Sequence, residues 1–285
     1  MRRLLLLSLS SLLLLCPQTY AKFTADFSQW LSDYYGPRVR DQIERLDLGP
    51  GGSRARSVGH GRREAHLCGH VVQTARLQGN EIYSTTYFNG AQGNPLKWIE
   101  YSMKCEYVKQ VRALIVAVRL YTGRNVDVIG FSLGVPVSRK AILGGRCVDT
   151  GENLGGPLTR VIDTYIGVAG PNRGAAPQLG PLSVPACALS ITPICNQVNG
   201  LYSGNCPAQS DFLQDINRYA HYEGQYTYSI YTQKDQMVGY TVCGQLTSPL
   251  PGQNGQRVYT DLNHDQVFDN THEVQLRMIK DHVVT

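Results

Sequence analysis

After its first fifteen residues this sequence contains no apolar segment long enough to cross a lipid bilayer, which excludes a membrane-spanning helix from the rest of the chain. Charge is also scarce, because only 17% of the 285 residues are Asp, Glu, Lys or Arg. The formal net charge of +5 is too small to indicate a nucleic-acid partner. Internal repeats and low-complexity tracts are absent beyond the first residues, so a globular domain is expected.

The first 21 residues have the pattern of a secretory signal rather than of folded structure. Two arginines precede the apolar stretch Leu4–Leu15, and Thr19-Tyr20-Ala21 places small residues at the −3 and −1 positions of a cleavage site. The apolar stretch, about 12 residues long, is short for the alternative, an uncleaved membrane anchor. We therefore predict cleavage after Ala21, secretion, and one large domain over residues 22–285.

The cysteines are expected to form disulfides. Eight are present, and Cys16 lies in the predicted signal. Disulfides are the default in a secreted protein, so an odd number of remaining cysteines leaves one without a partner in the chain. We expect this to be Cys68, because its surroundings differ in composition from the rest of the chain. The other six leave several connectivities open: Cys105, Cys147, Cys187, Cys195, Cys206 and Cys243.

Apolar periodicity predicts strands that alternate with helices, which is typical of an α/β fold with a mainly parallel sheet. The predicted helices are Asp26–Tyr35, Pro95–Tyr121, Leu133–Leu143 and Thr271–Ile279, and the predicted strands are Glu81–Phe88, Asp127–Phe131, Val161–Val168 and Thr227–Thr232. Residues 171–225 are rich in Pro, Gly and Cys and are expected to form an insert at one edge of the sheet, stapled by Cys187, Cys195 and Cys206.

The pentapeptide Gly130-Phe131-Ser132-Leu133-Gly134 is the most informative motif in the chain. It has the pattern G-x-S-x-G and lies between a β-branched run and a predicted helix. That context is typical of a nucleophile elbow, a sharp turn that presents a reactive serine. Glycines are needed around Ser132 because a side chain there would collide with neighbouring backbone. Ser132 is therefore the predicted nucleophile, and the backbone N–H of Leu133 a predicted oxyanion donor.

A serine nucleophile needs a base, and the base needs an acid that holds its tautomer. Downstream of an elbow the order is acid and then His. Asp235 follows the predicted strand 226–232, and the carboxyl ends of parallel strands are where active sites collect. Asp163, inside a predicted strand, is the alternative acid. Asp127 precedes the elbow and is expected to point to a face of the sheet.

Three histidines follow Asp235 in the chain: His264, His272 and His282. His264 lies in a polar loop before the last predicted helix, whereas His272 would begin that helix and His282 lies near the frayed end. We therefore predict His264 as the base. His221 precedes Asp235 and breaks the expected order.

At these points the sequence resembles the class 2 lipases of the EstA/EstB type, most closely the secreted lipase-related proteins of nematodes. The resemblance extends over residues 81–282. It is carried by these segments: Glu81–Tyr87, Asn94–Cys105, Asp127–Gly134, Gly167–Gly174, Asp235 with Val238-Gly239, and Asn263-His264-Asp265.

The resemblance implies an α/β-hydrolase fold and hydrolysis of carboxylic esters, with lipid esters as substrates, met at a lipid–water interface. It also implies a triad of Ser132, Asp235 and His264. This chemistry needs neither a metal nor another cofactor. Two alternatives stay open: a secreted protein that keeps the fold as a non-catalytic scaffold, and, more weakly, a secreted peptidase with the same triad.

The chain departs from the family over residues 53–80. The family has an apolar strand that ends in His-Gly, and the loop after it supplies the second oxyanion donor. Residues 53–80 show no convincing buried strand, so that donor is unknown, and His60-Gly61 and Gly69-His70 are only nominal substitutes. Such a chain would be a weakened hydrolase.

Three interpretations of residues 53–80 remain open. The first is a divergent loop. The second is a metal or polyanion site of His60, His66, Cys68 and His70, but this spacing matches no zinc pattern. The third is a segment translated in the wrong frame or from a mis-chosen exon, which the abrupt change in composition and the odd cysteine favour.

Overall fold

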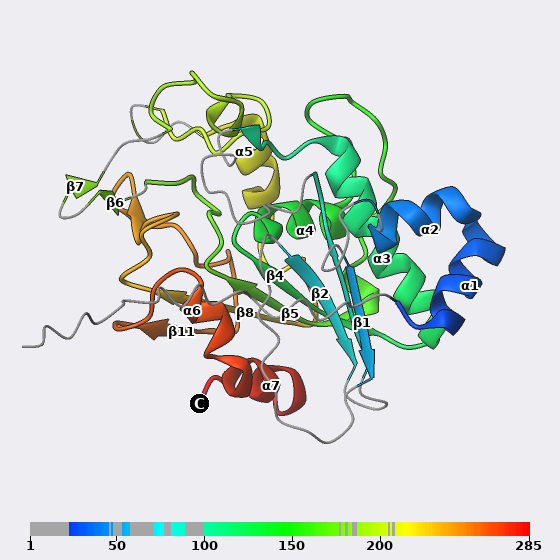
Figure 1. Cartoon of the computed structure of the whole chain (residues 1–285). Coiled ribbons are helices and arrows are strands. Elements are labelled where there is room, and N and C mark those ends of the chain that lie inside the picture. The colour runs from blue at the N-terminus through cyan, green and yellow to red at the C-terminus, as the bar shows by residue number, and fades with distance from the viewer. Residues whose placement is uncertain are drawn as a thin grey trace, which may run out of the picture.

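A seven-stranded sheet in the order β1-β3-β2-β4-β5-β8-β11 forms the centre of the molecule (Figure 1). The computed structural model describes residues 23–45, 47, 53–57, 71–76, 81–88, 100–176, 178–179, 182–183, 187–204, 206 and 209–285. The strands of this sheet are β1 (Ser53–Ser57), β2 (Val71–Arg76), β3 (Glu81–Thr86), β4 (Val126–Phe131), β5 (Ile162–Val168), β8 (Tyr226–Thr232) and β11 (Gly255–Tyr259).

Strands β4, β5, β8 and β11 are parallel neighbours and form the half of the sheet that carries the elbow. Every residue of β4 is buried, as expected for a strand covered on both faces. Val126 and Val128 belong to one apolar core, and Ile129 and Phe131 belong to a second. This alternation follows from the two-residue period of a strand, so β4 separates two cores.

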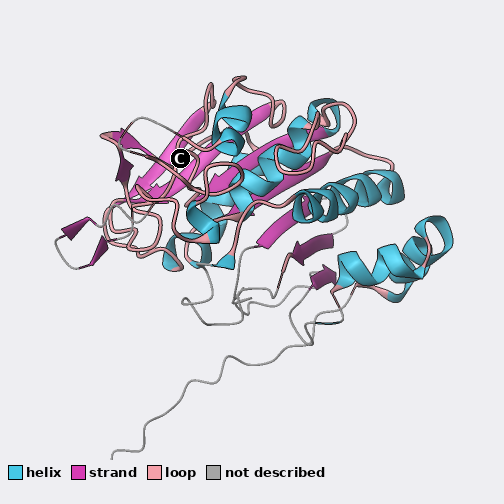
Figure 2. Ribbon diagram, turned by 90° about the horizontal axis from the view of Figure 1, so that it is seen from above, coloured by secondary structure: helices cyan, strands magenta, loops and turns pink. Residues whose placement is uncertain are grey.

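Helices cover both faces of the sheet (Figures 1 and 2). Helices α3 (Cys105–Thr122) and α4 (Gly134–Leu143) contribute to the first core, and α1 (Ala25–Tyr35) and α2 (Pro37–Glu44) pack beside α3. Helices α6 (Gln266–Asp269) and α7 (His272–Lys280) contribute to the second core, on the opposite face. Within the described part of the chain, no helix combines the length and the apolar character that crossing a bilayer requires.

The predicted helices and strands are confirmed, with one shifted start. The helix expected from Pro95 begins at Cys105, because residues 101–104 are not helical and Met103 N–H donates to Asn199 O at 2.8 Å. Helix α2 has no counterpart among the predicted helices, because Gly36-Pro37 has the pattern of a helix terminator. Pro37 instead opens α2, where a missing N–H costs nothing. Strand β11 was also missed, because its residues are partly exposed.

Residues 53–80, for which the sequence predicts no convincing buried strand, do contribute strands to the sheet. Strands β1 and β2 both lie there, and β2 occupies an interior position between β3 and β4. However, β2 runs antiparallel to β4, with Val72 opposite Gly130 and Ala75 opposite Asp127. The carboxyl end of β2 therefore lies away from the elbow, opposite to the strand that the resemblance implies. The frame interpretation stays a prediction.

Residues 171–225 include, besides loops, the hairpin of β6 (Gln178–Leu179) and β7 (Leu182–Ser183) and the helix α5 (Asp211–Asn217), which was not predicted. A second short hairpin, β9 (Thr241–Val242) and β10 (Gln245–Leu246), follows β8, and 3₁₀ turns occupy Thr159–Val161 and Pro193–Cys195.

Three disulfides join the six cysteines expected to pair: Cys105–Cys147, Cys187–Cys195 and Cys206–Cys243. Cys187–Cys195 closes a loop within the segment 171–225, whereas Cys206 ties that segment to the loop after β8. Cys68, expected to have no partner, lies outside the described residues. The predicted cleavage site after Ala21 also lies outside them.

Candidate active site

Ser132 lies in a sharp turn between β4 and α4. Its φ of 52° falls in the left-handed region, and its N–H donates to Val168 O of β5 at 2.9 Å. A Cβ at Gly130 would lie 2.9 Å from Ser138 Oγ and 3.0 Å from Val135 Cα, so glycine is required there for α4 to leave the strand this closely. The strained turn predicted from the pentapeptide is therefore present.

The structure brings together the three side chains predicted from the sequence. His264 Nε2 lies 2.9 Å from Ser132 Oγ, and His264 Nδ1 lies 2.7 Å from Asp235 Oδ2. All three residues are buried, with 1% of each exposed. When Nδ1 carries the ring proton and donates it to Asp235, Nε2 can accept the proton of the serine hydroxyl. Three side chains so arranged can act as a nucleophile, a base and an orienting acid.

Asp235 is held by the loop that follows β8. Its Oδ1 accepts hydrogen bonds from the N–H groups of Met237 and Val238, both at 2.9 Å. The loop in turn packs on the segment after β5, because Ala176 N–H donates to Val238 O at 2.9 Å. Gly239 has a φ of 82°, and a Cβ there would lie 2.3 Å from Ala176 O. These contacts hold the carboxylate of Asp235 in one orientation.

His264 lies in the loop between β11 and α6, and its surroundings set its pKa. Burial disfavours the imidazolium, but the charge and hydrogen bond of Asp235 and the charge of Asp265 outweigh burial and raise the pKa above its ordinary value of 6.5. The backbone N–H of His264 donates to Gln236 Oε1 at 3.1 Å, and its ring lies against Phe131. His264 is thus positioned from both the loop of Asp235 and the elbow.

The alternative acids and bases lie elsewhere. Asp127 accepts from Thr164 N–H at 3.1 Å inside the sheet, and Asp163 lies 3.6 Å from His282 Nε2. His272 is exposed near Asp269 O, and His221 is exposed near Gly252 O. The four residues of the suggested metal site, His60, His66, Cys68 and His70, lie outside the described residues. Asp235 and His264, rather than these residues, therefore form the hydrogen-bonded row with Ser132.

Oxyanion donors are expected at the start of α4. Leu133 is buried directly before Gly134, the first residue of the helix, where N–H groups have no partner within the helix. A second donor from the region before β4 cannot come from the carboxyl end of β2, because that end points away from Gly130. His60-Gly61 and Gly69-His70 both lie outside the described residues.

A buried ion pair behind the elbow was missed by the sequence analysis. Arg139 of α4 donates through Nε to Glu223 Oε1 at 2.8 Å, and both residues are fully buried. Its other nitrogens donate to Asn172 Oδ1 at 3.1 Å, Asn217 Oδ1 at 2.9 Å and Ile216 O at 2.6 Å. The sequence did contain a signal for this pair, because two cations in the apolar helix VPVSRKAIL need buried partners.

These contacts connect the elbow helix to the acid loop. Asn172 follows β5 and donates to Ser248 O at 2.9 Å, and its chain continues to Ala176, which bonds Val238 beside Asp235. Arg139 therefore connects the helix that follows the elbow to the segment that packs against the loop of Asp235.

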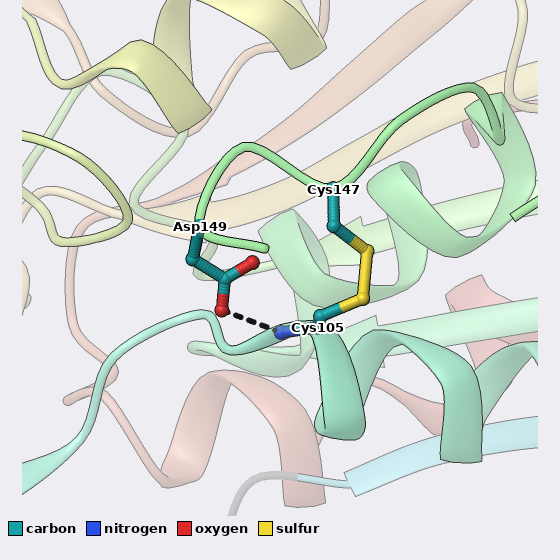
Figure 3. Close-up of side chains that lie close together, drawn as sticks. All are labelled: Cys105, Cys147 and Asp149. Carbon is teal, nitrogen blue, oxygen red and sulfur yellow. Dashed lines mark hydrogen bonds between the residues drawn. A yellow bond between two sulfur atoms is a disulfide. The ribbon is translucent and has the colours of Figure 1, made fainter. Parts of the chain in front are cut away.

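A cluster of Cys105, Cys147 and Asp149 has the residue types of a metal site (Figure 3). The two cysteines form a disulfide, so neither offers the thiolate that a metal ion binds. Asp149 instead accepts from Cys105 N–H at 2.9 Å, which satisfies a donor at the start of α3. The cluster is a helix cap joined to a crosslink.

Comparison with known proteins gives one family. The model of the family described as Lipase (class 2) matches residues 60–277 of this chain. No curated protein matches the chain. The match, together with the four parallel neighbours β4, β5, β8 and β11 and the helices on both faces of the sheet, identifies the α/β-hydrolase fold predicted from the sequence.

The similar solved structures are distant. The crystal structure of the Bacillus licheniformis lipase BlEst2 in mature form is 13% identical with a TM-score of 0.40, and the match covers 63% of this chain and 74% of that one. Aspergillus fumigatus lipase B is 14% identical with a TM-score of 0.40, and the match covers 61% of this chain and 41% of that one. A structure from the metagenome-derived lipolytic enzymes LipS and LipT is 14% identical with a TM-score of 0.35, covering 70% and 82%.

Proposed function

Because the chain belongs to the class 2 lipase family, which makes it a lipolytic hydrolase, we propose that it cleaves carboxylic esters of lipids with Ser132 as nucleophile, His264 as base and Asp235 as orienting acid. One observation carries this proposal. Two hydrogen bonds, of 2.9 and 2.7 Å, link Ser132, His264 and Asp235 in a buried row. In this row the serine proton has an acceptor and the resulting imidazolium has a counter-charge.

Acyl transfer follows from this geometry. His264 Nε2 removes the proton of Ser132 as Oγ attacks the ester carbonyl carbon, and Asp235 stabilises the imidazolium that forms. The imidazolium then protonates the leaving alcohol, and the acyl group stays on Ser132. Water, deprotonated by the same His264, attacks the acyl-enzyme and releases the carboxylic acid. Asp235 keeps its hydrogen bond to Nδ1 in both steps.

The developing negative charge on the carbonyl oxygen needs donors. The N–H of Leu133, at the positive end of the α4 dipole, is the donor that the elbow supplies. A second donor would add about 10²–10³ in rate, so a chain with one donor would be a slow hydrolase rather than an inactive one.

The three disulfides fit an extracellular protein. Secretion through a signal cleaved after Ala21 belongs to the same proposal, because disulfides form and persist in oxidising compartments. Mass spectrometry of the secreted protein would reveal an N-terminus at Lys22.

A fluorophosphonate probe, which reacts with activated serines, tests the catalytic proposal. Labelling is expected for the folded protein and is expected to vanish in Ser132→Ala. The exposed Ser190, replaced by alanine, is the matched control and should label normally. Folded protein that does not react would favour the non-catalytic scaffold. Hydrolysis rates across p-nitrophenyl esters of increasing acyl length would then separate a lipase from a short-chain esterase.

A further inference from the structure

Strands β8 and β11 are parallel neighbours, and they lead into the loops that carry Asp235 and His264 (Figure 1). Thr232, the last residue of β8, is buried, with 1% exposed. Its hydroxyl donates to Leu262 O at 2.6 Å and accepts from Lys234 N–H at 3.2 Å. One hydroxyl therefore contacts the backbone two residues before His264 and one residue before Asp235.

The direction of the Thr232 side chain follows from the period of the strand. Tyr228 and Ile230 belong to the second core, on the face of the sheet that α6 covers. Because side chains alternate along a strand, Thr232 points to that face as well, and Leu262 packs against the same core. An apolar side chain would serve burial here equally well, so packing alone does not require a hydroxyl at this position.

The bond from Thr232 to Leu262 is not part of a local turn. A threonine hydroxyl that accepts from the N–H two residues later is a common turn feature, but 30 residues separate Thr232 from Leu262. Thr227, in the same strand, gives a contrast. It is also fully buried, yet its Oγ1 has no hydrogen-bond partner within the described part of the chain. Strand β8 thus contains one buried threonine that joins two loops and one that does not.

The loop of His264 has internal bonds that make it a stiff unit. Asn263 N–H donates to Gln266 Oε1 at 3.0 Å, and Gln266 N–H donates to Asn263 Oδ1 at 2.9 Å. This reciprocal pair, of the capping-box type, fixes the chain on both sides of His264. The position of such a loop against the loop of Asp235 depends on the bonds between the two loops, of which the bond from Thr232 is buried inside the protein.

We propose that Thr232 is a positioning residue, whose hydroxyl holds the loop of His264 where the imidazole can keep its 2.7 Å hydrogen bond to Asp235. Catalytic geometry has to be held within about 0.5 Å, and a displacement of about 1 Å by a remote change can cost about 10²-fold in rate. The effect on rate rests on the proposed function. The position of His264 against Asp235 is a property of the fold and can be measured without catalysis.

Thr232→Val removes the hydroxyl and keeps the shape of the side chain. We expect kcat on a soluble ester to fall by about 10–100-fold with KM unchanged, because Thr232 bonds backbone rather than the reacting groups. Thr227→Val, the same substitution in the same strand with no hydrogen bond to lose, is the matched control and should keep its kcat. Thr232→Ser restores a hydroxyl and should recover most of the lost rate. Dividing each rate by the concentration of sites that a fluorophosphonate titrates to completion keeps unfolded protein out of the comparison.

The pKa of His264 provides a readout that a loss of packing alone would not move. The charge and hydrogen bond of Asp235, and the charge of Asp265 in the loop of His264 itself, raise this pKa. A loop that relaxes away from Asp235 should therefore lower the pKa of His264. The shift should be visible in the pH profile of kcat/KM and in an NMR titration of the imidazole. Thr227→Val and Thr232→Ser should titrate like the unchanged protein.

A Thr232→Val variant that keeps the kcat or the His264 pKa of the unchanged protein would overturn the proposal, as would equal losses in Thr227→Val or no recovery in Thr232→Ser. A Thr232→Val variant that fails to fold while Thr227→Val folds would also overturn it, because the hydroxyl would then serve stability alone. Unchanged protein that neither reacts with the fluorophosphonate nor hydrolyses any ester would refute the proposed function instead. The NMR titration would still decide whether Thr232 positions His264.

Discussion

His264 Nε2 and Ser132 Oγ lie 2.9 Å apart, although 132 residues separate them in the chain. Ser132 is placed by the strained turn after β4, and His264 by the loop between β11 and α6 at the far side of the parallel strands. The contact therefore depends on the order of β4, β5, β8 and β11. Changes that disturb the loops at the carboxyl ends of these strands are expected to affect catalysis before they affect stability.

Replacing Asp235 by asparagine should lower kcat by roughly 10³–10⁴ with a small change in KM. Asn keeps an oxygen for the N–H groups of Met237 and Val238 but removes the charge that stabilises the imidazolium and orients the ring. Steady-state kinetics on a soluble ester measures the effect. Asp163→Asn, at the rejected alternative acid, is the control. Equal losses in the two variants would contradict the role of Asp235.

The pH profile of kcat/KM should have a rising limb with a midpoint above 6.5, because His264 must be neutral to act as a base and its pKa is raised. Asp235→Asn removes the charge of Asp235, the largest of the causes that raise the pKa of His264, so the residual activity should titrate at lower pH. The pH dependence of the stability has the opposite sign to that of the activity. A raised pKa stabilises the fold fully below the ordinary pKa of 6.5, and that stabilisation disappears as the pH rises through the raised pKa.

Gly239→Ala should lower kcat by at least about tenfold without contact with substrate. The new methyl group would lie 2.3 Å from Ala176 O, so the loop must move and Asp235 with it. Gly244→Ala is a matched control, since Gly244 also has a positive φ, of 74°, but has no atom within 4 Å of an added Cβ. The control should lose only about 1 kcal/mol of stability and keep its kcat. Equal kcat values would refute the contact argument.

Arg139→Met should destabilise the protein by about 3–5 kcal/mol, measured by urea unfolding. It would leave Glu223 fully buried without its cation. Adding Glu223→Gln should recover part of the loss, because the orphaned charge is then removed as well. Arg160→Met, at an exposed arginine, is expected to change stability by less than about 0.5 kcal/mol. A double variant no more stable than the single one would argue against the ion pair as the cause.

Removal of the Cys105–Cys147 disulfide by double serine substitution should cost about 4 kcal/mol, against about 2.5 kcal/mol for Cys187–Cys195. The separations of 42 and 8 residues set this order, since a longer closed loop restricts the unfolded chain more. Unfolding of each variant under matched conditions measures both values. The reverse order would point to native-state contacts, such as the Asp149 cap on α3, rather than to unfolded-chain entropy.

The sequence was sufficient for features that depend on local pattern and chain order. Strand, glycine turn and helix around Ser132 form a local motif, and the order of acid and base selected Asp235 and His264. The same logic found the buried strands β4, β5 and β8, because apolar runs bounded by turns are visible without knowledge of the fold. The sequence also selected the six cysteines that pair.

Tertiary structure alone decided which distant groups meet. Six cysteines allow many pairings, and only packing placed Cys206 beside Cys243. Arg139 and Glu223 are 84 residues apart, so no local pattern could identify the pair. The antiparallel direction of β2 against β4 could not be predicted either, because strand direction depends on the connections between strands and not on side-chain alternation. Local sequence determines which groups are available for chemistry, whereas long-range packing determines their partners.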